Sequence, residues 1–164
     1  MTTAIANPAI TPIALIFSLN DNLVLQALEG LTQDELWHAP TCDNNGLLWV
    51  AGHVVQTRAM ILQMLGEPAD TGWGNLFDRG AKIGDPKQYP AGTEIARAMR
   101  EITPRLHRAL ANASSNQLNQ PASLGIPGFN TLGDELAFFG LHESYHVGQL
   151  AYIRKGLGYA GIAG

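Results

Sequence analysis

The chain has 164 residues, of which 46% are hydrophobic and 15% are charged. This composition is typical of a folded chain with a core of its own and unlike that of disordered chains, so we expect one domain. Ten basic residues against fourteen acidic ones give a net charge of −4, and the basic residues form no cluster. We therefore expect no nucleic-acid partner, because binding to phosphates requires clustered basic side chains.

The cysteine content and the N-terminal residues indicate the cellular compartment. The single cysteine, Cys42, excludes a disulfide within the chain, which fits a reducing environment. The first twenty residues lack the positive charge that precedes the apolar part of a secretory signal. No uninterrupted apolar run approaches the roughly 20 residues needed to cross a bilayer. We expect a cytoplasmic protein without a membrane segment.

Four long segments carry apolar residues at helical spacing, which predicts helices at about 12–29, 47–65, 93–113 and 131–155. Thr32 and Glu35 have the spacing of a capping box and predict a short helical turn after the first helix. Thr131 is expected to cap the fourth helix together with Asp134. Pro104 predicts a kink or a break in the third helix. No segment has the pattern of a convincing strand.

A long connection, residues 67–92, separates the second and third predicted helices and is rich in glycine, proline and aspartate. Connections of this length inside a compact domain are often functional. The predicted fold is therefore all-α, a four-helix bundle with a long crossover connection. Such bundles build metal sites from side chains on facing helices.

Three histidines are candidate metal ligands. His142 and His146 are four residues apart on the fourth helix, so their side chains lie on the same side about one turn apart. His53 lies on the apolar stripe of the second helix, and we expect it to face them. His38, in a loop, and His107, beside two arginines, fit such a site less well. The alternative is that all three are hydrogen-bonded core histidines.

Three neutral imidazoles leave a position open for water or substrate, which is the pattern of catalytic rather than structural metal sites. Zinc or nickel suits imidazole ligands best, although iron, manganese and cobalt stay open. An ion at this position would acidify a bound water or thiol.

The residues around the two histidines suggest further roles. His142, Glu143 and His146 match the H-E-x-x-H pattern of zinc peptidases, in which the glutamate is a general base. The chain offers no third ligand downstream of the motif, which disfavours a peptidase. Glu143 is a candidate catalytic base, but it lies about 100° around the helix from His142 and alternatively faces solvent or a neighbouring helix. Gln149 is a candidate for a hydrogen bond to a ligand or histidine, and Gly148 for close packing of another helix or partner.

These residues also carry a family resemblance. The histidine at position 53, the pattern His-x-x-x-His-x-Gly-Gln at 142–149 and the segment Ile-Arg-Lys-Gly-Leu-Gly at 153–158 resemble the DinB-like family. The resemblance implies a four-helix bundle with a long crossover, often dimeric, and a metal on His53, His142 and His146. This chain has Tyr145 and Val147 where the family frequently has histidine and arginine.

The leading functional hypothesis is a metal-dependent enzyme that acts on a small molecule. The family that the chain resembles includes thiol-dependent transferases or isomerases as well as hydrolases. Our first choice is an S-transferase in which a low-molecular-weight thiol attacks an electrophile. A second hypothesis is hydrolysis by a metal-activated water, with Glu143, Asp78 or Asp85 as base. The third is a non-catalytic, metal-stabilised interaction or stress-response protein. Whichever of the three holds, we expect a homodimer, as the resemblance implies.

Overall fold

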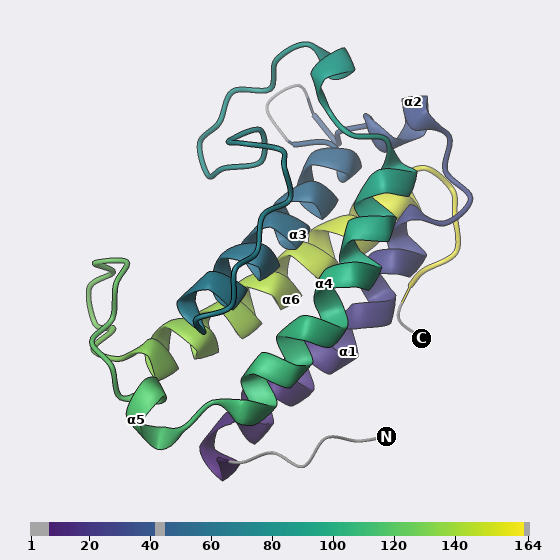
Figure 1. Ribbon diagram of the computed structural model, residues 1–164. Coiled ribbons are helices and arrows are strands. Elements are labelled where there is room, and N and C mark those ends of the chain that lie inside the picture. Colours follow the sequence, from purple (N-terminus) through teal and green to yellow (C-terminus); the bar gives the residue numbers. More distant parts are fainter. Residues whose placement is uncertain (1–6, 42–44, 163–164) are drawn as a thin grey trace.

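The computed structural model describes residues 7–41 and 45–162 and consists of helices and their connections (Figure 1). The elements are, in chain order, η1 (Pro8–Ile10), α1 (Thr11–Leu28), α2 (Gln33–Leu36), α3 (Leu47–Met64), η2 (Pro86–Gln88), α4 (Gly92–Asn112), α5 (Ser115–Leu118) and α6 (Leu132–Gly156). Apart from an isolated bridge between Pro121 and Thr131, the described residues contain no extended pairing. The predicted all-α class is confirmed. Cys42 lies outside the described residues.

The four long helices form a bundle in which α1 and α3 occupy opposite corners, because each packs against both α4 and α6. Figure 1 shows that α3 and α4 run in the same direction, so the chain must return along the bundle between them. The segment 65–91, called the crossover below, makes this return along the outside of α3. The predicted bundle with a long crossover is thus the observed architecture.

The helix ends follow the capping signals in the sequence. At the start of α2, the Thr32 hydroxyl accepts a hydrogen bond from the Glu35 N–H at 3.3 Å, and the Glu35 carboxylate accepts from the Thr32 N–H at 2.8 Å. Thr131 and Asp134 form the same reciprocal pair at the start of α6. The four long helices begin and end within one residue of the predicted bounds. Of the kink or break expected at Pro104, the break does not occur: α4 continues through this proline, which lies on its exposed side.

One helical segment, Pro8–Leu28, is long and apolar enough to span a membrane by length and composition alone. The sequence reading expected no such stretch. In the structure α1 packs against α4 and α6 as one corner of the bundle. Only 22% of this apolar window is buried within the bundle.

A buried arginine joins the four helices at the centre of the bundle. Arg58 of α3 is fully buried and donates to both carboxylate oxygens of Glu143 on α6, each at 2.7 Å. It also donates to Asp21 on α1 at 2.8 Å and to Thr103 on α4 at 2.7 Å. Desolvation lowers the pKa of Arg58, but the hydrogen bonds and charges of Glu143 and Asp21 outweigh it, and the net effect raises that pKa. The guanidinium is therefore charged and holds α6 against α3.

Candidate metal centre

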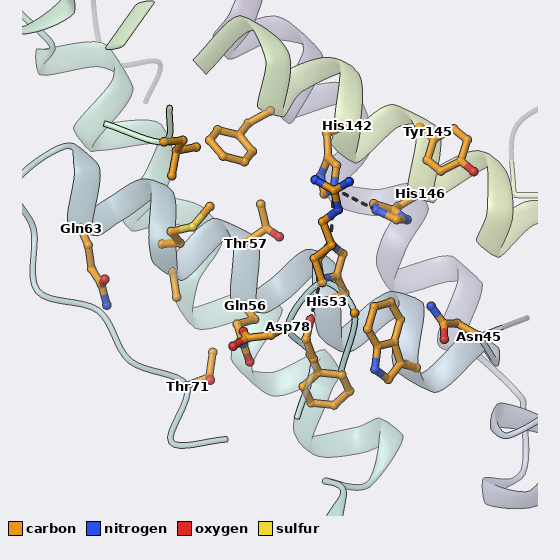
Figure 2. Close-up of a pocket in the computed structure, with 18 of the residues that line it drawn as sticks. Asn45, His53, Gln56, Thr57, Gln63, Thr71, Asp78, His142, Tyr145 and His146 are labelled. Carbon is orange, nitrogen blue, oxygen red and sulfur yellow. Dashed lines mark hydrogen bonds between the residues drawn. The ribbon is translucent and has the colours of Figure 1, made fainter. Parts of the chain in front are cut away.

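Three histidine side chains meet between α3 and α6. Figure 2 shows His53 reaching from α3 toward His142 and His146 on α6. The Nε2 atom of His142 lies 3.3 Å from Nε2 of His53 and 3.1 Å from Nε2 of His146. The three ligand atoms lie within 4.8 Å of one another. The structure thus brings together the three histidines that the sequence singled out.

These separations fit a metal ion. A tetrahedral zinc ion with zinc–nitrogen bonds of about 2.0–2.1 Å requires its ligand nitrogens to be about 3.3–3.4 Å apart. The two Nε2 separations around His142 are close to that value. Neutral imidazole nitrogens are also the ligand type that zinc and nickel accept.

A contact with the crossover determines which ring nitrogen of His53 carries the proton. The Phe77 carbonyl oxygen lies 2.6 Å from Nδ1 of His53. Because a carbonyl can only accept, Nδ1 carries the proton, and Nε2 presents its lone pair to the other two histidines. A metal ligand whose other ring nitrogen is held in this way keeps its tautomer and its orientation.

Two neighbouring contacts hold the same stretch of the crossover against α3. The Trp49 indole N–H donates to the Leu76 carbonyl at 3.1 Å, and the Gln56 amide donates to the Asp78 carboxylate. Together with the His53 contact, one side of α3 therefore binds three consecutive crossover residues, 76–78. We call this set of contacts the α3–crossover clamp.

Gln149 orients His146 in the same way that the Phe77 carbonyl orients His53. Its amide oxygen lies 2.6 Å from Nδ1 of His146 and accepts the proton there, which leaves Nε2 of His146 free to bind a metal. The Gln149 amide nitrogen in turn donates to the Tyr145 hydroxyl at 3.2 Å. The structure thus places Gln149 where the sequence suggested a supporting hydrogen bond.

All three histidines are neutral at pH 7. Burial lowers the pKa of His53 and of His146, against the opposing hydrogen bonds from Phe77 and Gln149. The pKa of His142 falls to about 4, first because of burial and then because of the charges of His146, His53 and Arg79. Protons therefore compete weakly with a metal ion for these nitrogens near neutral pH.

A cavity of about 1130 Å³ opens at the histidine cluster. Its walls come from α3, α6, the crossover and the connection between α5 and α6. The apolar wall includes Trp49, Phe77 and Phe138, and polar groups include Gln63 and Thr71, which lie at the far side from the histidines in Figure 2. A small molecule can occupy this space beside the three histidines.

The remaining candidates from the sequence lie elsewhere. The structure does not bring Glu143 to the cluster, because Arg58 binds both of its carboxylate oxygens and it does not line the cavity. Asp78 does line the cavity, whereas Asp85 accepts a hydrogen bond from the Lys87 N–H in a surface turn.

The other two histidines are also apart from the cluster. His38 is exposed, and His107 binds Asp21 at 2.6 Å. Gly148 has open space where a side chain would start.

The sequence reading missed the groups that the crossover contributes. Neither the Phe77 carbonyl nor Gln56 was a candidate, and Arg79, which lines the cavity, was not singled out either. A backbone carbonyl has no signal in the sequence. For Gln56 a signal existed, since it lies three residues after His53 and therefore close to it on the helix surface.

The fold agrees with the comparisons to known proteins. The DinB superfamily matches residues 16–150, so the chain belongs to the DinB superfamily. No curated protein matches it in sequence. A solved structure, of a conserved protein from Enterococcus faecalis, is similar with a TM-score of 0.69 and 14% identity over 88% of this chain and 94% of that one. At this identity the likeness supports the fold alone.

Proposed function

We propose that this protein is a metal-dependent enzyme that binds a divalent ion, zinc or nickel, through His53, His142 and His146. The observation that carries the proposal is the convergence of three neutral imidazole nitrogens at the inner end of a cavity. Three protein ligands leave a fourth position for a substrate atom, as in catalytic sites.

The reaction that we propose is transfer of a low-molecular-weight thiol to a small electrophile. A bound divalent ion would lower the pKa of a thiol at the open position and so favour the nucleophilic form at neutral pH. The sulfur would then form a bond to the electrophilic carbon, and the thiol proton would pass to solvent. The electron pair of the broken bond would leave with the halide of a haloaromatic, or stay on the ring oxygen of an epoxide, which would take a proton from solvent. Trp49, Phe77 and Phe138 supply an apolar wall for the electrophile.

The test is turnover with defined components. Zinc- or nickel-loaded protein is incubated with a panel of small thiols and haloaromatic or epoxide electrophiles, and conjugates are measured by mass spectrometry. We expect conjugation that requires both the metal and the thiol and that is lost in His146→Ala. If His146→Ala turns over as fast as the wild type, the metal mechanism is wrong.

A second candidate is hydrolysis of a small substrate, and the position of Asp78 favours it. Asp78 lines the cavity, and its neighbour Phe77 contacts His53. A carboxylate at this position could accept a proton from an attacking water. Turnover without any thiol, abolished by Asp78→Asn, would favour hydrolysis over thiol transfer. Metal binding without either activity would favour a non-catalytic, metal-stabilised protein.

The outer face of α6 supports the homodimer that we propose. Leu141, Tyr145, Gly148 and Tyr152 recur at spacings of four, three and four residues, which is the spacing of a helix–helix seam. The three large side chains are 67%, 63% and 72% exposed. Apart from its chain neighbours and the backbone of its own helix, no atom of the described chain lies within 4 Å of the position of a Gly148 Cβ, so a helix of a second copy can approach closely there.

The neighbouring helix also exposes two large apolar side chains. Leu15 and Leu19 of α1, which packs against α6, are 57% and 63% exposed. We expect Tyr152→Arg to shift the protein from dimer to monomer in light scattering after size exclusion. Tyr152 does not line the cavity at the histidines, so the variant should keep its metal. A wild type that is monomeric at millimolar concentration would contradict the dimer.

A further inference from the structure

Arg79 is an unpaired cation in the wall of the histidine cavity. It lines the same cavity as His53, His142 and His146. Its positive charge is one of the causes that lower the pKa of His142, which places the guanidinium within electrostatic reach of that ring. Among the residues that the structure describes, Arg79 forms no hydrogen bond or ion pair.

The backbone of Arg79 is held on both sides, although its side chain is exposed. On one side, the α3–crossover clamp binds the three residues before it. On the other, the Ala81 N–H donates to the Asp78 carbonyl at 2.9 Å and closes a tight turn with Arg79 at its second position. Gly80 takes the third position with φ of 81°, a conformation that favours glycine. The start of the Arg79 side chain is therefore fixed beside the cavity.

Two carboxylates of the crossover, Asp70 and Asp78, also line the cavity, and within the described part of the chain neither forms an ion pair with Arg79. Asp78 accepts a hydrogen bond from Gln56, and Asp70 accepts one from the Gly72 N–H at 2.9 Å. Three neutral imidazoles would leave both charges of a divalent ion uncompensated. With the ion bound, the cavity would hold two positive centres, the ion and Arg79, whose three charges are not fully offset by the two carboxylates.

We propose that Arg79 binds a carboxylate of the molecule whose reacting atom lies at the three-histidine site. An arginine guanidinium can donate two parallel hydrogen bonds to a carboxylate. This pair orients the bound molecule as well as compensating its charge. Arg79 thus selects an anionic thiol or substrate over a neutral one of the same shape. This inference rests on the proposed metal site and adds the charge of its ligand.

The test compares two thiols that differ in charge. Cobalt-loaded protein is titrated with 3-mercaptopropionate and with its neutral amide, 3-mercaptopropionamide, and the sulfur-to-cobalt absorption gives both dissociation constants. The variants are Arg79→Gln and, as a matched control, Lys82→Gln, which removes one exposed positive charge of the crossover that does not line the cavity. The two thiols differ in intrinsic acidity, but this difference is the same for every variant. It therefore cancels when the ratio of the two constants is compared between variants.

We expect the preference for the anionic thiol to fall about tenfold or more in Arg79→Gln, the size of a lost charge-assisted interaction, and to stay unchanged in Lys82→Gln. Metal content should be equal in all three proteins. If both thiols bind and the ratio is the same in Arg79→Gln as in the wild type, the role of Arg79 is wrong while the metal site stands. If cobalt binds and neither thiol produces the absorption, or if no cobalt binds, the proposed function itself fails and the inference fails with it.

Discussion

The Phe77 carbonyl oxygen lies 2.6 Å from Nδ1 of His53 and so links the crossover to the three-histidine cluster. This contact depends on Gly52, the residue before His53. A Cβ at position 52 would lie 2.2 Å from the Phe77 ring, far inside van der Waals contact. Phe77 is fully buried and packs against α3 because this residue has no side chain.

Replacing Gly52 by alanine should therefore weaken metal binding without touching a ligand. The new methyl group pushes Phe77 away, and its carbonyl no longer orients His53. We expect zinc affinity to fall about 10–100-fold, the range for loss of a group that supports a metal ligand. Competition with a chromophoric chelator measures this affinity.

The matched control is Gly140→Ala on α6. A Cβ there would meet the Ile16 side chain at 3.5 Å, an ordinary contact, so zinc affinity should not change. An affinity of Gly52→Ala equal to that of the wild type would show that the carbonyl contact does not support His53.

Gln149 should matter for the metal through His146. In Gln149→Ala the Nδ1 proton of His146 loses its acceptor, and we expect about tenfold weaker zinc binding. Tyr145→Phe removes only the hydroxyl that accepts from Gln149, so its effect should be clearly smaller. Equal zinc affinities in Gln149→Ala and the wild type would exclude this supporting role.

Glu143 should contribute to stability through Arg58. In Glu143→Leu the fully buried guanidinium loses two hydrogen bonds of 2.7 Å, and we expect a loss of about 3–5 kcal/mol in the free energy of unfolding by urea. The exposed pair of Arg97 with Glu101 is the control, since Glu101→Leu should cost less than about 1 kcal/mol. A Glu143→Leu variant as stable as the wild type, yet without activity, would instead support the catalytic base suggested by the H-E-x-x-H pattern.

The lowered pKa of His142 predicts the pH dependence of the metal-free protein. Between pH 6.5 and about 4, the unfolded chain binds a proton at His142 and the folded chain does not. The unfolding free energy should therefore fall as the pH falls through this window, with a contribution that ends near pH 4. In His142→Ala, urea unfolding in the presence of chelator should show a shallower slope. A slope as steep as that of the wild type would mean that His142 titrates normally.

The sequence predicted the helices well because their signals are local. Apolar spacing and the capping pairs at Thr32 and Thr131 depend only on residues close in the sequence. Both capping boxes are present in the structure. The convergence of His53 on His142 and His146 followed from helical spacing and from the requirement that apolar stripes face each other.

The contributions of the crossover could not be predicted, because they depend on the path of a long loop. Nothing near Phe77 or Arg79 in the sequence shows that this segment returns along α3. The role of Glu143 was open for another reason, since an adjacent position on a helix lies about 100° away. Its partner had a signal: Arg58 is the only lysine, arginine, aspartate or glutamate in α3, and a charge in such an apolar helix requires an opposite charge.

The metal content of the purified protein tests the central claim most directly. Protein without a histidine tag is incubated with zinc or nickel, freed of excess ion and analysed by elemental mass spectrometry, beside His53→Ala and His142→Ala. We predict about one equivalent of metal in the wild type and its loss in both variants, because each histidine supplies one of three ligands. A folded wild type that retains neither metal, or variants that retain as much as the wild type, would contradict the account.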